Sequence, residues 1–150
     1  MMSVFPTKIL LATDGSEEAT LAAETAAELA NKLDSELHVL YVGLLAYQPG
    51  SYQEEYVGSY VEEQKDLDKI AQDMLGEQVR KIEASGSSVA QAHLDTGKPD
   101  VAITELAERL GAGLIVMGSR GLGGIRRTLM GSVSDSVIRH AHCAVLIVRE

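Results

Sequence analysis

The stretch "MGSRGLGGIRRTLMGSVS", residues 117–134, runs from the end of an apolar segment to the start of a helical pattern and holds five of the chain's fourteen glycines. Glycine loses more conformational freedom on folding than any other residue, so such a cluster indicates a backbone shaped for a purpose. Arg120, Arg126 and Arg127 lie in the same stretch of a chain whose formal net charge is −9. Glycines beside arginines in an otherwise acidic protein predict a loop that binds an anion.

The glycines of this stretch follow the pattern G-x-x-G-x9-G-S, formed by Gly118, Gly121 and Gly131 with Ser132. Without Cβ atoms, main-chain N–H groups can approach phosphate oxygens, and the predicted helix start at Ser132 adds donors and a favourable dipole. The chain has neither the lysine motif of a P-loop nor G-x-G-x-x-G after its first apolar run, which argues against NAD. A glycine turn without a ligand, and surface arginines without a partner, stay as alternatives.

The rest of the chain alternates short apolar runs with longer amphipathic patterns, and the whole of residues 1–150 is expected to form one domain. Such alternation predicts an α/β fold: a doubly wound, five-stranded parallel sheet with helices on both faces, Rossmann-like, in strand order 3-2-1-4-5. The expected strands are residues 8–13, 36–42, 89–95, 113–117 and 144–150, and the last three expected helices are residues 60–84, 99–110 and 132–140.

The expected ligand crevice opens at the carboxyl ends of the first and fourth strands, where the strand order reverses. These two strands end in "ATDGS" and "MGSRG". The glycine loop is therefore expected to lie across from Asp14, whose carboxylate suits the hydroxyls of a sugar. A capping role for Asp14 on the following helix is the alternative.

Composition narrows the class of protein. The single cysteine, Cys143, excludes an internal disulfide and indicates a reducing, cytoplasmic compartment. No apolar run approaches the ~20 residues that span a bilayer, and the amino-terminal residues lack the apolar core of a signal peptide, so no membrane association is expected. The net charge of −9 and the absence of tryptophan argue against nucleic acid as a partner.

Two further patterns are interpreted as side chains that pack inside the fold. Within residues 60–84, an apolar stripe that includes Ile70 and Met74 is expected to pack on the sheet. His38 and His93 fall inside expected strands and are expected to pack there. Neither pattern predicts chemistry.

Three segments together, "KILLATDGS", residues 117–134 and "AVLIVRE", resemble the universal stress proteins, in particular the branch whose glycine loop accompanies ATP binding. The resemblance implies ATP or another adenine nucleotide, with Mg²⁺ or Mn²⁺ held through the phosphates rather than by a protein metal site. It implies that Asp14 accepts from ribose hydroxyls. The residues that it assigns to adenine and ribose are Ala12, Thr13, Asp14 and Val42, and those around the phosphates and sugar are Met117, Gly118, Ser119, Arg120, Gly121, Gly131, Ser132, Val133 and Ser134.

The leading functional hypothesis is a nucleotide-dependent regulatory switch in stress response that acts on unidentified protein partners. ATP would order the glycine loop and a lid-like segment after Val42. A fast ATPase would need a residue that positions water near the γ-phosphate, and the loop offers no carboxylate for that role. The alternatives are an enzyme that hydrolyses ATP slowly or transfers adenylyl groups, and a structural dimer with a vestigial pocket.

The last expected strand lies at a sheet edge in the order 3-2-1-4-5. Its residues Ala144 to Arg149 lack the lysine, proline or inward charge that protects a free edge. The sequence therefore predicts a homodimer in which two copies of this strand pair across a two-fold axis, as the family resemblance also implies.

Overall fold

The computed structural model describes residues 7–46, 57–119 and 131–149. Strands and helices alternate along the chain, as predicted. The elements are β1 (Lys8–Thr13), α1 (Glu17–Leu33), β2 (Glu36–Gly43), α2 (Val57–Ala84), β3 (Gln91–Thr96), α3 (Pro99–Leu110), β4 (Leu114–Gly118), α4 (Ser132–His140) and β5 (Ala144–Val148).

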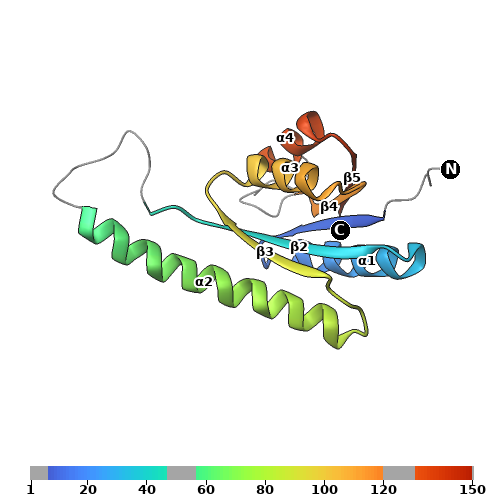
Figure 1. The fold of residues 1–150 in the computed structure, drawn as a ribbon, viewed down its shortest axis with the longest axis horizontal. Coiled ribbons are helices and arrows are strands. Elements are labelled where there is room, and N and C mark those ends of the chain that lie inside the picture. Colours follow the sequence, from blue (N-terminus) through green and yellow to red (C-terminus); the bar gives the residue numbers. More distant parts are fainter. Residues whose placement is uncertain (1–6, 47–56, 120–130, 150) are drawn as a thin grey trace.

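The five strands form one parallel sheet in the order β3-β2-β1-β4-β5, which confirms the predicted topology (Figure 1). β1 lies at the centre, where Ile9 pairs with Leu37 of β2 on one side and with Leu114 of β4 on the other. The strand order reverses between β1 and β4. The carboxyl ends of these strands therefore meet at the edge where ligands bind in this class of sheet.

Two helical layers cover the sheet, with α1 and α2 on one face and α3 and α4 on the other (Figure 1). Successive side chains of a strand point to opposite faces, so Leu11 packs beneath α1 while Leu10 packs against α3. Because both faces of β1 are buried, its sequence is a continuous apolar run rather than an alternating one.

Local sequence explains where the helices begin and end. The Ser16 hydroxyl accepts a hydrogen bond from the Ala19 N–H at 3.1 Å and so caps α1. Pro99 occupies the first turn of α3, where its missing N–H costs nothing. Gly111 ends the same helix with φ of 68°, a left-handed conformation that glycine adopts readily.

Several sequence expectations need correction. β2 extends to Gly43, β4 covers Leu114–Gly118 rather than residues 113–117, and β5 ends at Val148. α2 begins at Val57 rather than at residue 60, and β3 covers Gln91–Thr96 rather than residues 89–95. Ile70, assigned to the buried stripe, is 57% exposed. Its neighbour Ala71 is 2% exposed and packs on Gly43, so the exposure of Ile70 reflects the face of α2 on which it lies.

Candidate functional site at the strand ends

The turn after β1 places polar groups at the carboxyl edge of the sheet. Asp14 is half-buried, and its Oδ1 atom accepts a hydrogen bond from the Ser16 N–H at 2.9 Å. The Thr13 hydroxyl accepts from the Gly15 N–H at 3.3 Å. Ser16 is the residue that caps α1, so the capping alternative for Asp14 is wrong, and its carboxylate instead shapes the turn before the helix.

After β4, hydrogen bonds hold together the two ends of the glycine loop. The Gly131 N–H donates to the Ser119 carbonyl at 2.7 Å. The Ser134 hydroxyl lies 2.9 Å from the same carbonyl and 3.0 Å from the Gly131 carbonyl, so it donates within the loop base. The Ser119 N–H donates to the Val148 carbonyl at 3.2 Å, which ties this base to β5.

The start of α4 follows directly from the loop base. Gly131 is its N-cap residue and has no side chain to accept from the first-turn N–H groups. Those groups point out of the helix at its positive end, which favours an anion. Ser132 is exposed there, and Val133 is half-buried against the core beneath α3 and α4.

Strand register brings the predicted adenine and sugar residues to one edge. Thr13 lies opposite Tyr41, so Asp14, just after β1, and Val42, within β2, each lie one step further along the chain. Ala12, Val42 and Met117 are buried in the core cluster on the α3 and α4 face. Since their side chains are covered, a ligand at this edge would meet mainly the main-chain atoms of these residues.

Part of the predicted site lies outside the described residues. This part comprises Arg120 and Gly121, together with Arg126, Arg127 and the remaining loop glycines. Most of the lid-like segment expected after Val42 is outside as well, because residues 47–56 are not described.

Two residues near this turn were not singled out for the site by sequence reasoning. Burial, and after it the negative charge of Asp14, raises the pKa of Tyr41, which places the phenol within reach of that carboxylate's field. Met74 of α2 lies against Gly15, where its Cε atom occupies the space that a Cβ would need. Strand pairing could have indicated Tyr41, whereas helical periodicity assigned Met74 only to the general core.

Within residues 7–46, 57–119 and 131–149, no group of three or more His, Cys, Asp or Glu side chains is arranged to hold a metal ion. In the same ranges, no helix combines the length and apolar character needed to cross a membrane.

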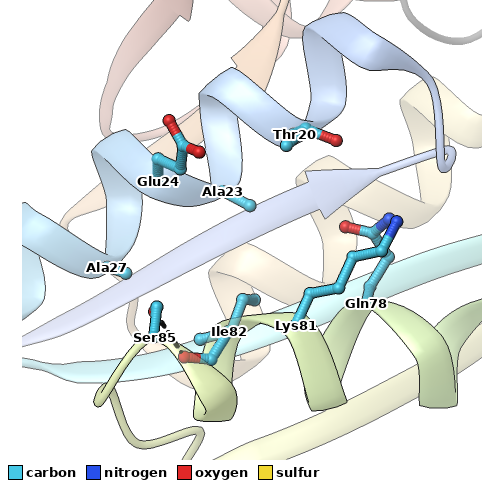
Figure 2. Close-up of a pocket in the computed structure, with 8 residues that line it drawn as sticks. All are labelled: Thr20, Ala23, Glu24, Ala27, Gln78, Lys81, Ile82 and Ser85. Atoms are coloured by element: carbon cyan, nitrogen blue, oxygen red, sulfur yellow. Dashed lines mark hydrogen bonds between the residues drawn. The ribbon is translucent and has the colours of Figure 1, made fainter.

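A small pocket lies away from the strand ends, between α1 and α2 (Figure 2). Its volume is about 90 Å³. Side chains of α1 and α2, with Ser85 just after α2, line it; they are Thr20, Ala23, Glu24, Ala27, Gln78, Lys81, Ile82 and Ser85.

The strand order, the polar turn after β1 and the closed loop base before α4 define a doubly wound α/β protein in which the order reverses between β1 and β4, the position where this class of sheet binds ligands. The model of the universal stress protein family matches residues 6–149, and the chain belongs to this family. A universal stress protein of Methanocaldococcus jannaschii is 36% identical over 143 residues, which are 95% of this chain and 82% of the relative.

Solved structures agree with the fold. The universal stress protein UspA from Lactobacillus plantarum superimposes with a TM-score of 0.82 at 24% identity, covering 95% of this chain and 97% of that one. A universal stress protein in complex with cAMP has a TM-score of 0.66 at 26% identity, covering 96% and 97%. The Archaeoglobus fulgidus protein in complex with dAMP has a TM-score of 0.63 at 25% identity, covering 97% and 99%.

Proposed function

We propose that this protein binds an adenine nucleotide, with ATP as the leading ligand, and acts as a nucleotide-dependent regulatory protein in stress response. The observation that carries the proposal is the loop base, where Gly131 and Ser134 bond to the Ser119 carbonyl at the uncapped start of α4. In the proposal, the free first-turn N–H groups of α4 bind the phosphates while Asp14 binds the sugar. Two relatives solved as complexes with cAMP and dAMP support an adenine nucleotide as the ligand class.

The proposed roles follow from the chemistry of each group. Asp14 accepts from the ribose hydroxyls, since its carboxylate has a second oxygen besides the one bonded to Ser16. Main-chain atoms of Ala12, Thr13 and Val42 meet the adenine. The phosphates lie at the glycine loop and the start of α4, and Mg²⁺ or Mn²⁺ shares their charge. The residues proposed for this second part are Met117, Gly118, Ser119, Arg120, Gly121, Gly131, Ser132, Val133 and Ser134.

Two more features belong to the proposal. β5 lies at a sheet edge with its last four side chains only half-buried in the single chain, which supports the homodimer through Ala144 to Arg149.

A cytoplasmic location remains proposed on the ground of the single cysteine. Burial raises the pKa of the Cys143 thiol, which disfavours the reactive thiolate.

Isothermal titration of the purified protein with MgATP tests the proposal. We expect saturable binding of one nucleotide per chain, and parallel titrations with AMP and cAMP rank the adenine nucleotides. Mass spectrometry of the protein as purified identifies any nucleotide that it retains. No binding heat at ~100 μM protein in several buffers, together with no shift of melting temperature, would refute nucleotide binding.

A further inference from the structure

Helix α2 touches the residue that follows each of two proposed site residues. Met74 packs on Gly15, next to Asp14, and Ala71 packs on Gly43, next to Val42. A Cβ at Gly43 would lie 3.0 Å from the Ala71 Cβ, so helix and strand end are in close contact there. Ala71 and Met74 are three residues apart and share one face of α2. One helix therefore rests on the ends of both β1 and β2.

Hydrogen bonds also join α2 to the residues that follow β2. The Gln64 Oε1 atom accepts from the Ala46 N–H at 2.9 Å, and its Nε2 group donates to the Leu44 carbonyl at 3.1 Å. The Nε2 group also lies 2.8 Å from Asp68 Oδ1, which holds the amide in this orientation. These bonds link the chain after Val42 to the first half of α2.

The packing between α2 and α1 leaves room for such movement. The pocket of about 90 Å³ in Figure 2 separates Ala23 and Ala27 of α1 from Gln78 and Ile82 of α2. Well-packed interiors resist displacement because few gaps exceed the size of a water molecule. The unfilled volume between the two helices offers room for a small displacement of α2, while Met74 and Ala71 pack on the strand ends.

We infer that α2 carries nucleotide occupancy to the surface of the protein and that Met74 is the positioning residue for this coupling. The inference rests on the proposed function. Gly15 has φ of 81°, and its turn gains freedom if Met74 no longer packs on it. Nucleotide binding must then remove that freedom, which weakens affinity. In return, bound nucleotide restrains Met74 and with it the early turns of α2 beyond the sheet (Figure 1).

The test compares Met74→Ala with Val79→Ala in the full-length protein. Both residues are half-buried apolar side chains of α2, but Val79 packs on the general core and contacts neither strand-end glycine. Titration with MgATP gives the affinity, and hydrogen exchange with and without MgATP reports on residues 60–70. We expect Met74→Ala to weaken binding about fivefold or more and to abolish nucleotide-dependent protection of residues 60–70. Val79→Ala should change neither.

Met74→Leu keeps most of the apolar volume but removes the end of the side chain that lies over Gly15. If the alanine variant fails to fold, the leucine variant takes its place in the comparison with Val79→Ala. Equal affinities and equal protection in the Met74 and Val79 variants would overturn the coupling while leaving nucleotide binding intact. No binding by the wild-type protein would overturn both the proposed function and this inference.

Discussion

The Nδ1 atom of His38 lies 3.0 Å from the Nε2 atom of His93, across the neighbouring strands β2 and β3. The rings stack with centroids 5.3 Å apart, and His38 is only 4% exposed. One hydrogen atom lies between the two nitrogens, so the bond requires that one of them is unprotonated. The second nitrogen of His38 is 3.5 Å from Glu36 Oε1, with no hydrogen bond to any described residue. Both histidines pack in strands, as predicted.

We expect the stability of the fold to fall as the pH drops below about 6.5, the ordinary pKa of histidine. Burial lowers the pKa of His93, and the charges of His38 and Arg109 lower it further. The unfolded chain therefore binds more protons than the folded chain in this window. The stabilisation is complete above the unfolded pKa and is lost as the pH falls through the lowered folded pKa. Urea unfolding at pH 7.5 and at pH 5.5 measures the change.

His93→Gln keeps an amide that can bond to His38 but removes the titrating ring, so it should reduce the loss of stability between pH 7.5 and pH 5.5. His142→Gln is the control, because His142 is exposed between α4 and β5. In all three proteins, carboxylates also contribute to the loss of stability between pH 7.5 and pH 5.5. Their contribution is common to the three proteins and cancels when the losses are compared. Equal pH dependence in wild type and His93→Gln would contradict the expectation.

Asp14→Asn should weaken nucleotide binding about tenfold or more while leaving the fold intact. The asparagine carbonyl can still accept from the Ser16 N–H, so the turn keeps its hydrogen bond. The charged acceptor for ribose is lost, and a hydrogen bond to a charged group contributes ~1.5–3 kcal/mol. Titration calorimetry measures the affinity, and thermal unfolding confirms the fold.

The same variant has a readout that does not depend on nucleotide. Because the charge of Asp14 helps to raise the pKa of Tyr41, its removal should lower that pKa. Absorbance titration of tyrosine is practical, since the chain has five tyrosines and no tryptophan. A lowered tyrosine pKa with unchanged nucleotide affinity would show that Asp14 is placed as described but does not bind the ribose.

Some features of the fold could be predicted from sequence because they depend on local periodicity. The apolar run of β1 and the pattern of α3 indicate element types. Their alternation, together with right-handed crossovers and the usual doubly wound orders, predicts the strand order that the structure shows. The exposure of Ile70 could not be predicted, because it depends on which face of α2 turns toward the sheet, where the adjacent Ala71 is buried. Met74 packs on Gly15 because α2 crosses the turn after β1 at that residue. The point where a helix crosses a turn leaves no periodic signal in the sequence.

For the candidate site as well, sequence could identify some residues by their spacing but could not give their hydrogen-bond partners. Gly118 and Gly131 were found by their spacing in the chain, and the structure brings the segments that contain them together at the loop base. The family resemblance implies that Ser134 lies around the phosphates and sugar, and in this structure its hydroxyl donates within the loop base. Sequence gives the residue type at a helix start, but the choice of partner depends on which carbonyl lies within reach after folding.

Ser134→Ala should lower the free energy of unfolding by ~1–2 kcal/mol, because a buried hydroxyl bonded to main-chain carbonyls is lost. Ser134 is 2% exposed, so water cannot easily replace the hydroxyl. Ser132→Ala is the control, since Ser132 is exposed and the start of α4 has no side-chain cap. Urea unfolding of both variants measures the difference. Equal destabilisation of the two variants would show that the Ser134 bonds contribute little to the fold.

The orientation of β5 determines which proline substitution tests the proposed dimer. The Val148 carbonyl accepts from the Ser119 N–H, so Val148 directs its main-chain groups toward β4. The N–H and C=O of one strand residue point to the same side, and successive residues alternate. Ile147 therefore directs its N–H away from β4, toward the free edge where a second chain would pair. Proline at residue 147 removes that donor and leaves the pairing of Val148 with β4 in place.

Ile147→Pro should shift the protein from dimer to monomer, with at least a tenfold loss in dimer affinity by sedimentation or light scattering. Ile147→Ala is the matched control, because it removes the same side chain from the core cluster but keeps the N–H. If the dimer forms by strand pairing, the alanine variant stays dimeric at concentrations where the proline variant is a monomer. Two variants that dissociate alike would assign the association to side-chain packing, and a monomeric wild type would exclude the β5 dimer altogether.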